Sequence, residues 1–164
     1  MNYRLRPLVP ADAASVAALV RTAFAAQSVV TDPLPSALRV TEADVATHLE
    51  TGGGAVVEAD GVIVGSALWT KQDGRLYLSR LAVAPACRGR GVAKALLAAA
   101  EAAAREKRLP RIHLSTRIPL LDNRQLFAAC GFVETEREAH PGYAEPTSVH
   151  MEKRLLDCSI PSPA

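Results

Sequence analysis

The sequence has few aromatic residues and almost no net charge, and these absences exclude one broad class of partner. Only 4% of its 164 residues are aromatic, and the formal net charge is +2. A protein that binds nucleic acid usually presents a basic surface, and one that binds single strands adds aromatic rings on which bases stack. We therefore expect no nucleic-acid partner.

Metal-binding patterns and long apolar runs are also missing. The three cysteines, Cys87, Cys130 and Cys158, form neither a CxxC pair nor a zinc-binding spacing, so no metal is expected. The most apolar later stretch, residues 92–104, is interrupted by two charged residues and is too short to span a bilayer. Residues 1–10 contain no apolar core of a signal peptide. We expect a cytoplasmic protein without membrane contact.

What remains is the composition of an ordinary globular protein. Hydrophobic residues make up 49% of the chain and charged residues 22%. A chain of this length can bury a core without disulfides or a metal. Neither an internal repeat nor an interior linker is visible, so we predict a single domain over residues 1–156 and a flexible tail over residues 157–164.

The spacing of apolar residues predicts a fold of the α/β or α+β class with one mixed sheet. Two tight turns, Asp60-Gly61 and Asp73-Gly74, separate three strands, and Thr41 is the expected N-cap of a helix that the glycines 52–54 end. The expected order is β-α-α-β-β-β-α-β-α-β-β. Strands are expected at residues 3–8, 55–59, 62–70, 75–84, 112–116, 132–138 and 148–155, and helices from about 10, from 41, from about 93 to 107, and over 123–130.

The junction between the fourth strand and the following helix carries a phosphate-binding pattern. Gly89 and Gly91 have no side chain to keep a ligand from the backbone, and the first N–H groups of a helix are unpaired. The helix dipole and the charges of Arg88 and Arg90 add positive potential. These features together predict a cradle for a pyrophosphate, although a plain strand–helix turn is the simpler alternative.

Two other phosphate motifs fit the same residues poorly. In a P-loop, Lys and Ser or Thr follow the last glycine, whereas Val92 and Ala93 follow Gly91 here. A dinucleotide-binding fingerprint requires a small residue where Lys94 stands, and the next strand has no acidic end to bind a ribose.

The segment Arg88-Gly89-Arg90-Gly91-Val92-Ala93 resembles the Arg/Gln-x-x-Gly-x-Gly/Ala signature of the GCN5-related N-acetyltransferases (GNAT). Leu81-Ala82-Val83 before it, and Asn123 ahead of Gly131-Phe132, are similar to that family too. The resemblance covers residues 3–155 in element order. It implies a single, largely antiparallel mixed sheet whose central strands splay, flanked by helices.

The resemblance also implies a ligand and the residues that hold it. The pantetheine arm of acetyl-coenzyme A would lie between the splayed strands, paired with backbone groups of Leu81, Ala82 and Val83 and contacted by Asn123, which is alternatively a simple helix cap. The pyrophosphate would lie on Arg88, Gly89, Arg90, Gly91, Val92 and Ala93. The implied reaction is direct attack of a primary amine, from a small molecule or peptide, on the thioester, without a metal or an acyl-enzyme.

The sequence departs from the family at two positions that move protons. Phe127 stands where members often have a tyrosine that protonates the departing sulfur, and Ser115 stands where many have a glutamate. A thiol has a pKa near ~8.5, so its thiolate leaves without much help. We therefore predict an N-acetyltransferase, with a non-catalytic acyl-coenzyme A binding module as the alternative, and a possible homodimer.

A loop between the last two strands is the candidate acceptor site. Residues 140–147 combine His140 and Tyr143 with two prolines and a glycine. The prolines limit the conformations of the loop and the glycine permits a sharp bend, so a defined loop is expected. Histidine can take a proton from an amine, and tyrosine can donate one to a leaving sulfur. We predict Tyr143 and His140 as catalytic residues, the alternative being that Tyr143 only anchors the loop. His113, which alternates with apolar neighbours, reads as a core histidine.

Overall fold

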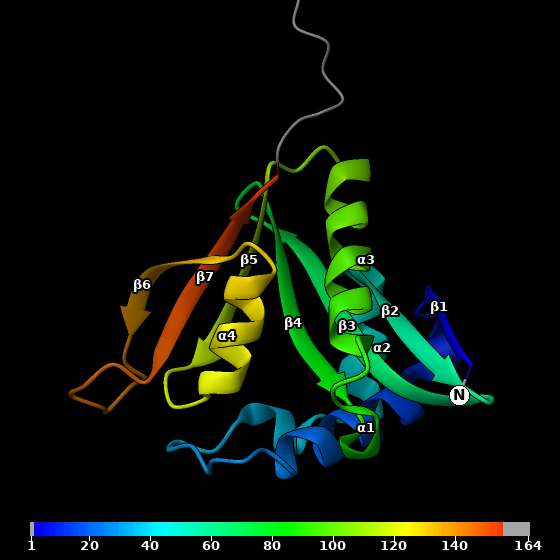
Figure 1. Cartoon of the computed structure of the whole chain (residues 1–164), viewed down its shortest axis with the longest axis horizontal. Helices are drawn as coiled ribbons and strands as arrows, with labels where there is room; N and C mark the ends of the chain where they lie inside the picture. Colours follow the sequence, from blue (N-terminus) through cyan, green and yellow to red (C-terminus); the bar gives the residue numbers. More distant parts are fainter. Residues whose placement is uncertain (1, 156–164) are drawn as a thin grey trace, which may run out of the picture.

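The structure, a computed structural model, describes residues 2–155, and the expected tail at 157–164 lies outside the described residues. The chain forms one seven-stranded sheet with helices on both faces (Figure 1). The strands are β1 (Tyr3–Pro7), β2 (Gly53–Ala59), β3 (Val62–Gln72), β4 (Arg75–Val83), β5 (Arg111–Arg117), β6 (Val133–Glu138) and β7 (Ser148–Arg154). The helices are α1 (Ala13–Ala25), α2 (Glu42–Thr51), α3 (Val92–Glu106) and α4 (Leu121–Ala129).

The sheet has the strand order β1-β2-β3-β4-β5-β7-β6 and is antiparallel everywhere except between β4 and β5. Both tight turns are present, because Asp60-Gly61 and Asp73-Gly74 have positive φ at both central residues, as two-residue hairpin turns require. The predicted element order and the mixed, largely antiparallel sheet are confirmed.

Helices α1 and α2 cover one face of the sheet and α3 and α4 the other. Val16 and Val20 of α1 and Val45 of α2 are fully buried with Val56 and Leu68 of the sheet. Thr41 caps α2 as predicted: its hydroxyl accepts the N–H of Asp44 at 3.1 Å, and the Asp44 carboxylate accepts the N–H of Thr41 at 2.9 Å.

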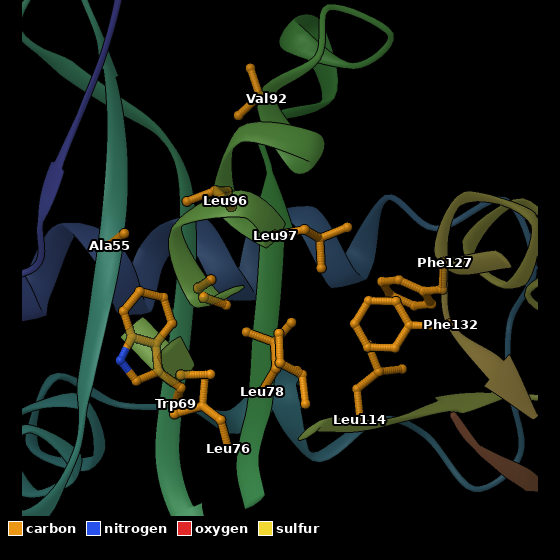
Figure 2. Close-up of a cluster of buried hydrophobic side chains, with 14 of the residues drawn as sticks. Ala55, Trp69, Leu76, Leu78, Val92, Leu96, Leu97, Leu114, Phe127 and Phe132 are labelled. Atoms are coloured by element: carbon orange, nitrogen blue, oxygen red, sulfur yellow. The ribbon is translucent and has the colours of Figure 1, made fainter. Parts of the chain in front are cut away.

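Helix α3 packs its apolar face against the centre of the sheet. Leu96, Ala100 and Ala104 are fully buried, and Figure 2 shows Leu97 beside β4, the strand that carries Leu76 and Leu78. The approach is closest at one glycine of β3. A Cβ added to Gly65 would lie 2.5 Å from Cγ1 of Val92. This contact fixes the first turn of α3 on the sheet, and with it the glycine-rich loop that precedes the helix.

Several element ends differ from the expected ones, three of them near the site or in the first half of the chain. α4 begins at Leu121 with Leu120 as its N-cap, so Asn123 lies inside the first turn and is not the cap. Strand β2 begins at Gly53 rather than residue 55, because Gly53 and Gly54 pair with Trp69 and Leu68 of β3. α1 begins at residue 13, after a 3-10 turn at Pro10–Asp12.

The buried Asp12 holds that 3-10 turn in place, since Arg6 donates two hydrogen bonds of 2.8 Å to its carboxylate. The hydrogen bonds from Arg6 lower the pKa of Asp12 and so favour its charged form.

Replacing Gly65 by alanine should displace α3. Because the added methyl group would overlap the β-branched Val92, we expect the free energy of unfolding to fall by about 1–3 kcal/mol, as in other overpacked cores. Urea unfolding followed by circular dichroism measures the change. Ser66→Ala is the matched control: Ser66 is fully buried and its hydroxyl has no partner among the described residues, so its removal should not destabilise. Equal stability of Gly65→Ala and the wild type would contradict this packing.

Candidate active site

The two parallel strands at the centre of the sheet pair over a very short length. β4 and β5 are paired only at Leu76 with Ile112 and at Tyr77 with His113. Beyond these positions β4 stays paired with β3 and β5 with β7, so the two strands diverge, as Figure 1 shows. The splayed central strands implied by the sequence are therefore present.

A β-bulge marks the β4 side of this split. Ser79 pairs with Leu68 and Ala82 with Ser66, so Arg80 and Leu81 together face the single residue between those two β3 partners. Arg80 has φ +52°, a left-handed conformation that costs a non-glycine residue roughly 1–2 kcal/mol. The bulge leaves one residue outside the ladder, and its backbone groups are available to a ligand. Such strain is typical of functional sites.

A cleft of about 1240 Å³ runs through the split. Its walls include both strands, the loop before α3, the start of α4 and the segment between α1 and α2. Nine of the ten predicted cofactor-binding residues line it, namely Leu81, Ala82, Val83, Arg88, Gly89, Gly91, Val92, Ala93 and Asn123. The tenth, Arg90, is exposed and does not line it.

The N-terminus of α3 opens into this cleft without a cap. Gly91 is the N-cap, no side chain of the described residues caps the helix, and its first turn contains no acidic residue. Gly89 and Gly91 have φ values of +75° and +82°, and a Cβ at either would meet nothing within 4 Å. The backbone N–H groups of this turn are thus accessible and carry the positive end of the helix dipole.

The two arginines of the loop differ in what they contact. Arg88 donates to the carbonyls of Ala23 and Ala26 at 3.1 and 3.3 Å, so its guanidinium caps the C-terminus of α1 rather than standing free. It therefore ties the loop to α1. The exposed side chain of Arg90 has no hydrogen bond or ion pair with another residue in the described part of the chain.

The two positions that depart from the family pattern lie on the cleft as well. Phe127 is 6% exposed and packs edge-on against Phe132, their ring centroids 5.9 Å apart (Figure 2). Its ring is therefore part of the hydrophobic core as well as of the cleft wall. Ser115 is exposed on the cleft wall formed by β5.

The predicted acceptor loop brings only one of its two candidate residues to the cleft. His140 lines the cleft and is half-buried, and its Nδ1 bonds the hydroxyl oxygen of Thr147. Tyr143 does not line it. Its hydroxyl donates to the carboxylate of Asp32 at 2.6 Å, a bond that raises the pKa of Tyr143.

Several cleft residues were missed from the sequence. Arg80 and Arg117 reach the side of the cleft that faces the α1–α2 segment, where they bind Ser36 and Pro33. Alternation along β5 puts Arg117 on the same face as Ser115, and this signal could have identified it. Arg80 could not be found in this way because the bulge breaks the alternation.

A second polar group lies beside the base of the split. His113 is 8% exposed and bonds His150 at 3.1 Å, and His150 bonds Glu138 at 2.7 Å. The Nδ1 atom of His113 has no partner among the described residues, so only one of the two ring nitrogens of this core histidine forms a hydrogen bond there. No group of three or more potential metal ligands occurs among residues 2–155, and no helix there is long and apolar enough to cross a membrane.

The split centre of the sheet, the bulge in β4 and the uncapped, glycine-flanked N-terminus of α3 thus lie together on one cleft. The model of the acetyltransferase (GNAT) family matches residues 20–132, and the chain belongs to that family. No curated protein sequence matches the chain.

Solved structures with the same fold include proteins from three organisms. The PaiA N-acetyltransferase of Thermoplasma acidophilum, in complex with coenzyme A, has a TM-score of 0.77 at 15% identity and covers 94% of this chain and 100% of its own. A GCN5-related N-acetyltransferase from Rhodopseudomonas palustris has a TM-score of 0.75 at 25% identity, covering 94% and 97%. The ribosomal-protein-S18-alanine N-acetyltransferase of Escherichia coli has a TM-score of 0.74 at 16% identity, covering 93% and 94%.

Because His113 is buried and its Nδ1 has no partner among the described residues, the free energy of unfolding should depend on pH. Burial, followed by the charges of Arg75 and His150, lowers the pKa of His113. An unfolded histidine titrates near ~6.5, so below that pH the unfolded chain binds a proton that the folded chain does not. The free energy of unfolding should therefore fall as the pH drops from about 7 to 5. We expect a shallower fall in His113→Gln, measured by urea unfolding across that range. An identical slope would show that His113 does not contribute.

Proposed function

We propose that this protein transfers the acetyl group of acetyl-coenzyme A to a primary amine by direct attack within a ternary complex. The observation that carries the proposal is the continuity of the cleft. It joins an uncapped, glycine-flanked helix N-terminus to the split between β4 and β5, so one elongated ligand can contact both.

The residues present fit such a ligand. The open space at Gly89 and Gly91 and the N–H groups at the start of α3 suit a pyrophosphate. The backbone of Leu81 and Val83, next to the bulge, would pair with the pantetheine arm, and Asn123 would contact the arm from α4. Acetyl-coenzyme A supplies an acetyl group already activated as a thioester.

His140 is the proposed base that keeps the acceptor amine neutral. The hydroxyl of Thr147 has a single proton, which it donates to the carbonyl of Glu138 at 3.3 Å. In the tautomer of His140 that donates from Nδ1 to Thr147, Nε2 retains its lone pair. A ring that lines the cleft with an unprotonated Nε2 can accept a proton from an ammonium group.

For Tyr143 the contacts favour anchoring over proton donation. The bond to Asp32 occupies its hydroxyl and raises its pKa, which makes it a weaker acid near neutral pH. The same bond joins the acceptor loop to the α1–α2 segment. With Phe127 in the core, the thiolate would then leave without a protein acid, and general acid assistance is typically worth only about 10²–10⁴-fold.

Gly91→Asp should weaken binding of coenzyme A at least about tenfold, or roughly 1.4 kcal/mol, because a carboxylate would enter the pyrophosphate cradle. Isothermal titration calorimetry measures the affinity. Gly61→Asp is the matched control, since Gly61 has nearly the same φ of +81°, equally open surroundings and a hairpin position outside the cleft. Unchanged affinity in folded Gly91→Asp would remove the loop from the binding site.

Substitutions in the acceptor loop separate its two residues. We expect His140→Gln to lower kcat at least tenfold with unchanged affinity for coenzyme A, because a base is lost. Tyr143→Phe retains the ring and removes only the hydroxyl, so kcat should change less than threefold. Steady-state kinetics with an accepted amine measure both. A tenfold loss of kcat in Tyr143→Phe would show that the hydroxyl takes part in catalysis, as the sequence analysis predicted.

The alternative, a binding module without turnover, is favoured by the absence of an acid at Phe127 and of a carboxylate at Ser115. Release of free thiol from acetyl-coenzyme A, measured with a pool of amines, separates the two functions. A homodimer and a cytoplasmic location stay predictions.

A further inference from the structure

Two guanidinium groups face the acceptor side of the cleft from its opposite walls. Arg80 lies in the bulge of β4 and Arg117 at the end of β5, and both line the cleft. Both are partly buried. Neither has a carboxylate within 4 Å among the described residues, whereas Arg6, Arg75, Arg111 and Arg124 all form ion pairs there.

One short segment between α1 and α2 binds both arginines. Arg80 donates to the hydroxyl of Ser36 at 3.1 Å, and Arg117 donates to the carbonyl of Pro33 at 2.5 Å. Three residues of extended chain span at most about 11 Å. Each guanidinium has five N–H donors in a planar fork, and one of them is used in each case. Most of the donors therefore remain available to a ligand between the strands.

The surrounding charges do not neutralise this pair. Asp44 is the carboxylate that acts on Arg80, and it lines the cleft too, but it is exposed and accepts the N–H of Thr41 as part of the α2 cap. Asp32 acts on Arg117, but it is exposed, accepts the hydroxyl of Tyr143 and does not line the cleft. Burial lowers the pKa of both arginines, which nonetheless stay charged at neutral pH.

We propose that the acceptor is a small molecule that carries a carboxylate near its primary amine, as an α-amino acid does, and that Arg80 and Arg117 bind this carboxylate. The proposal rests on the function proposed above and adds the substrate class. A planar carboxylate matches the fork of a guanidinium, and a partly buried charge gains most from such a partner. Binding the carboxylate at the open end of the split would direct the amine toward the bulge of β4, where the thioester is expected.

The experiment compares α-amino acids with the amines that lack only the carboxylate, for example phenylalanine with 2-phenylethylamine. Thiol release from acetyl-coenzyme A gives kcat/KM for each pair, and calorimetry on the protein saturated with coenzyme A gives the affinity for each amino acid. The variants are Arg117→Gln and Arg80→Gln. Arg21→Gln is the matched control, because Arg21 also donates to one backbone carbonyl, that of Val40, but does not line the cleft.

We expect at least a tenfold preference for one or more amino acids over their decarboxylated partners, lost in Arg117→Gln and Arg80→Gln and retained in Arg21→Gln. Coenzyme A affinity should not change in any variant. Turnover of the plain amines with equal or greater efficiency would overturn the substrate class while leaving the acetyltransferase proposal intact. Arginine-dependent binding of an amino acid without thiol release would support the carboxylate site and overturn the acetyltransferase proposal. If no amino acid binds, the inference is wrong.

Discussion

The structure depends on the short pairing of β4 with β5. Two residue pairs, Leu76 with Ile112 and Tyr77 with His113, hold the two halves of the sheet together, and beyond them the strands separate. The strands can separate because each remains paired through its backbone on its outer side, β4 with β3 and β5 with β7. A parallel pair that opens in the middle of a sheet exposes backbone hydrogen-bonding groups to the cleft, and these must be paired by a ligand or by water.

The other parts of the site are arranged around this opening. Helix α3 begins at the β4 side of the opening, and its contact with Gly65 keeps its N-terminal turn near the bulge. The segment between α1 and α2 crosses the open end, and Figure 1 shows it passing below the diverging strands. Four side chains from other parts of the site bind α1 or this segment: Arg80, Arg88, Arg117 and Tyr143. The segment is therefore a wall of the cleft, held by bonds from both sides of the split.

Local signals in the sequence predicted the fold well, and nine of the ten residues that they assigned to the cofactor line one cleft. Alternation, the Asp-Gly turns and the Thr41 cap depend on neighbouring residues, so they are visible without a structure. The glycine-rich turn before α3 is local in the same sense. The acceptor side of the cleft depends instead on contacts between residues far apart in the sequence. Arg80 reaches the cleft through a bulge, and Tyr143 bonds a residue 111 positions earlier in the chain. The predicted start of α4 was wrong because a leucine, not a recognisable capping residue, precedes that helix.

We propose above all that the split between β4 and β5 and the N-terminus of α3 together hold an acetyl-coenzyme A molecule. A crystal structure of the protein with coenzyme A tests it most directly. We expect the pantetheine arm between the two strands, hydrogen-bonded to the backbone near the Arg80 bulge, and the pyrophosphate on the N–H groups of residues 89–93. A ligand bound outside the split, with β4 and β5 closed on each other, would contradict it.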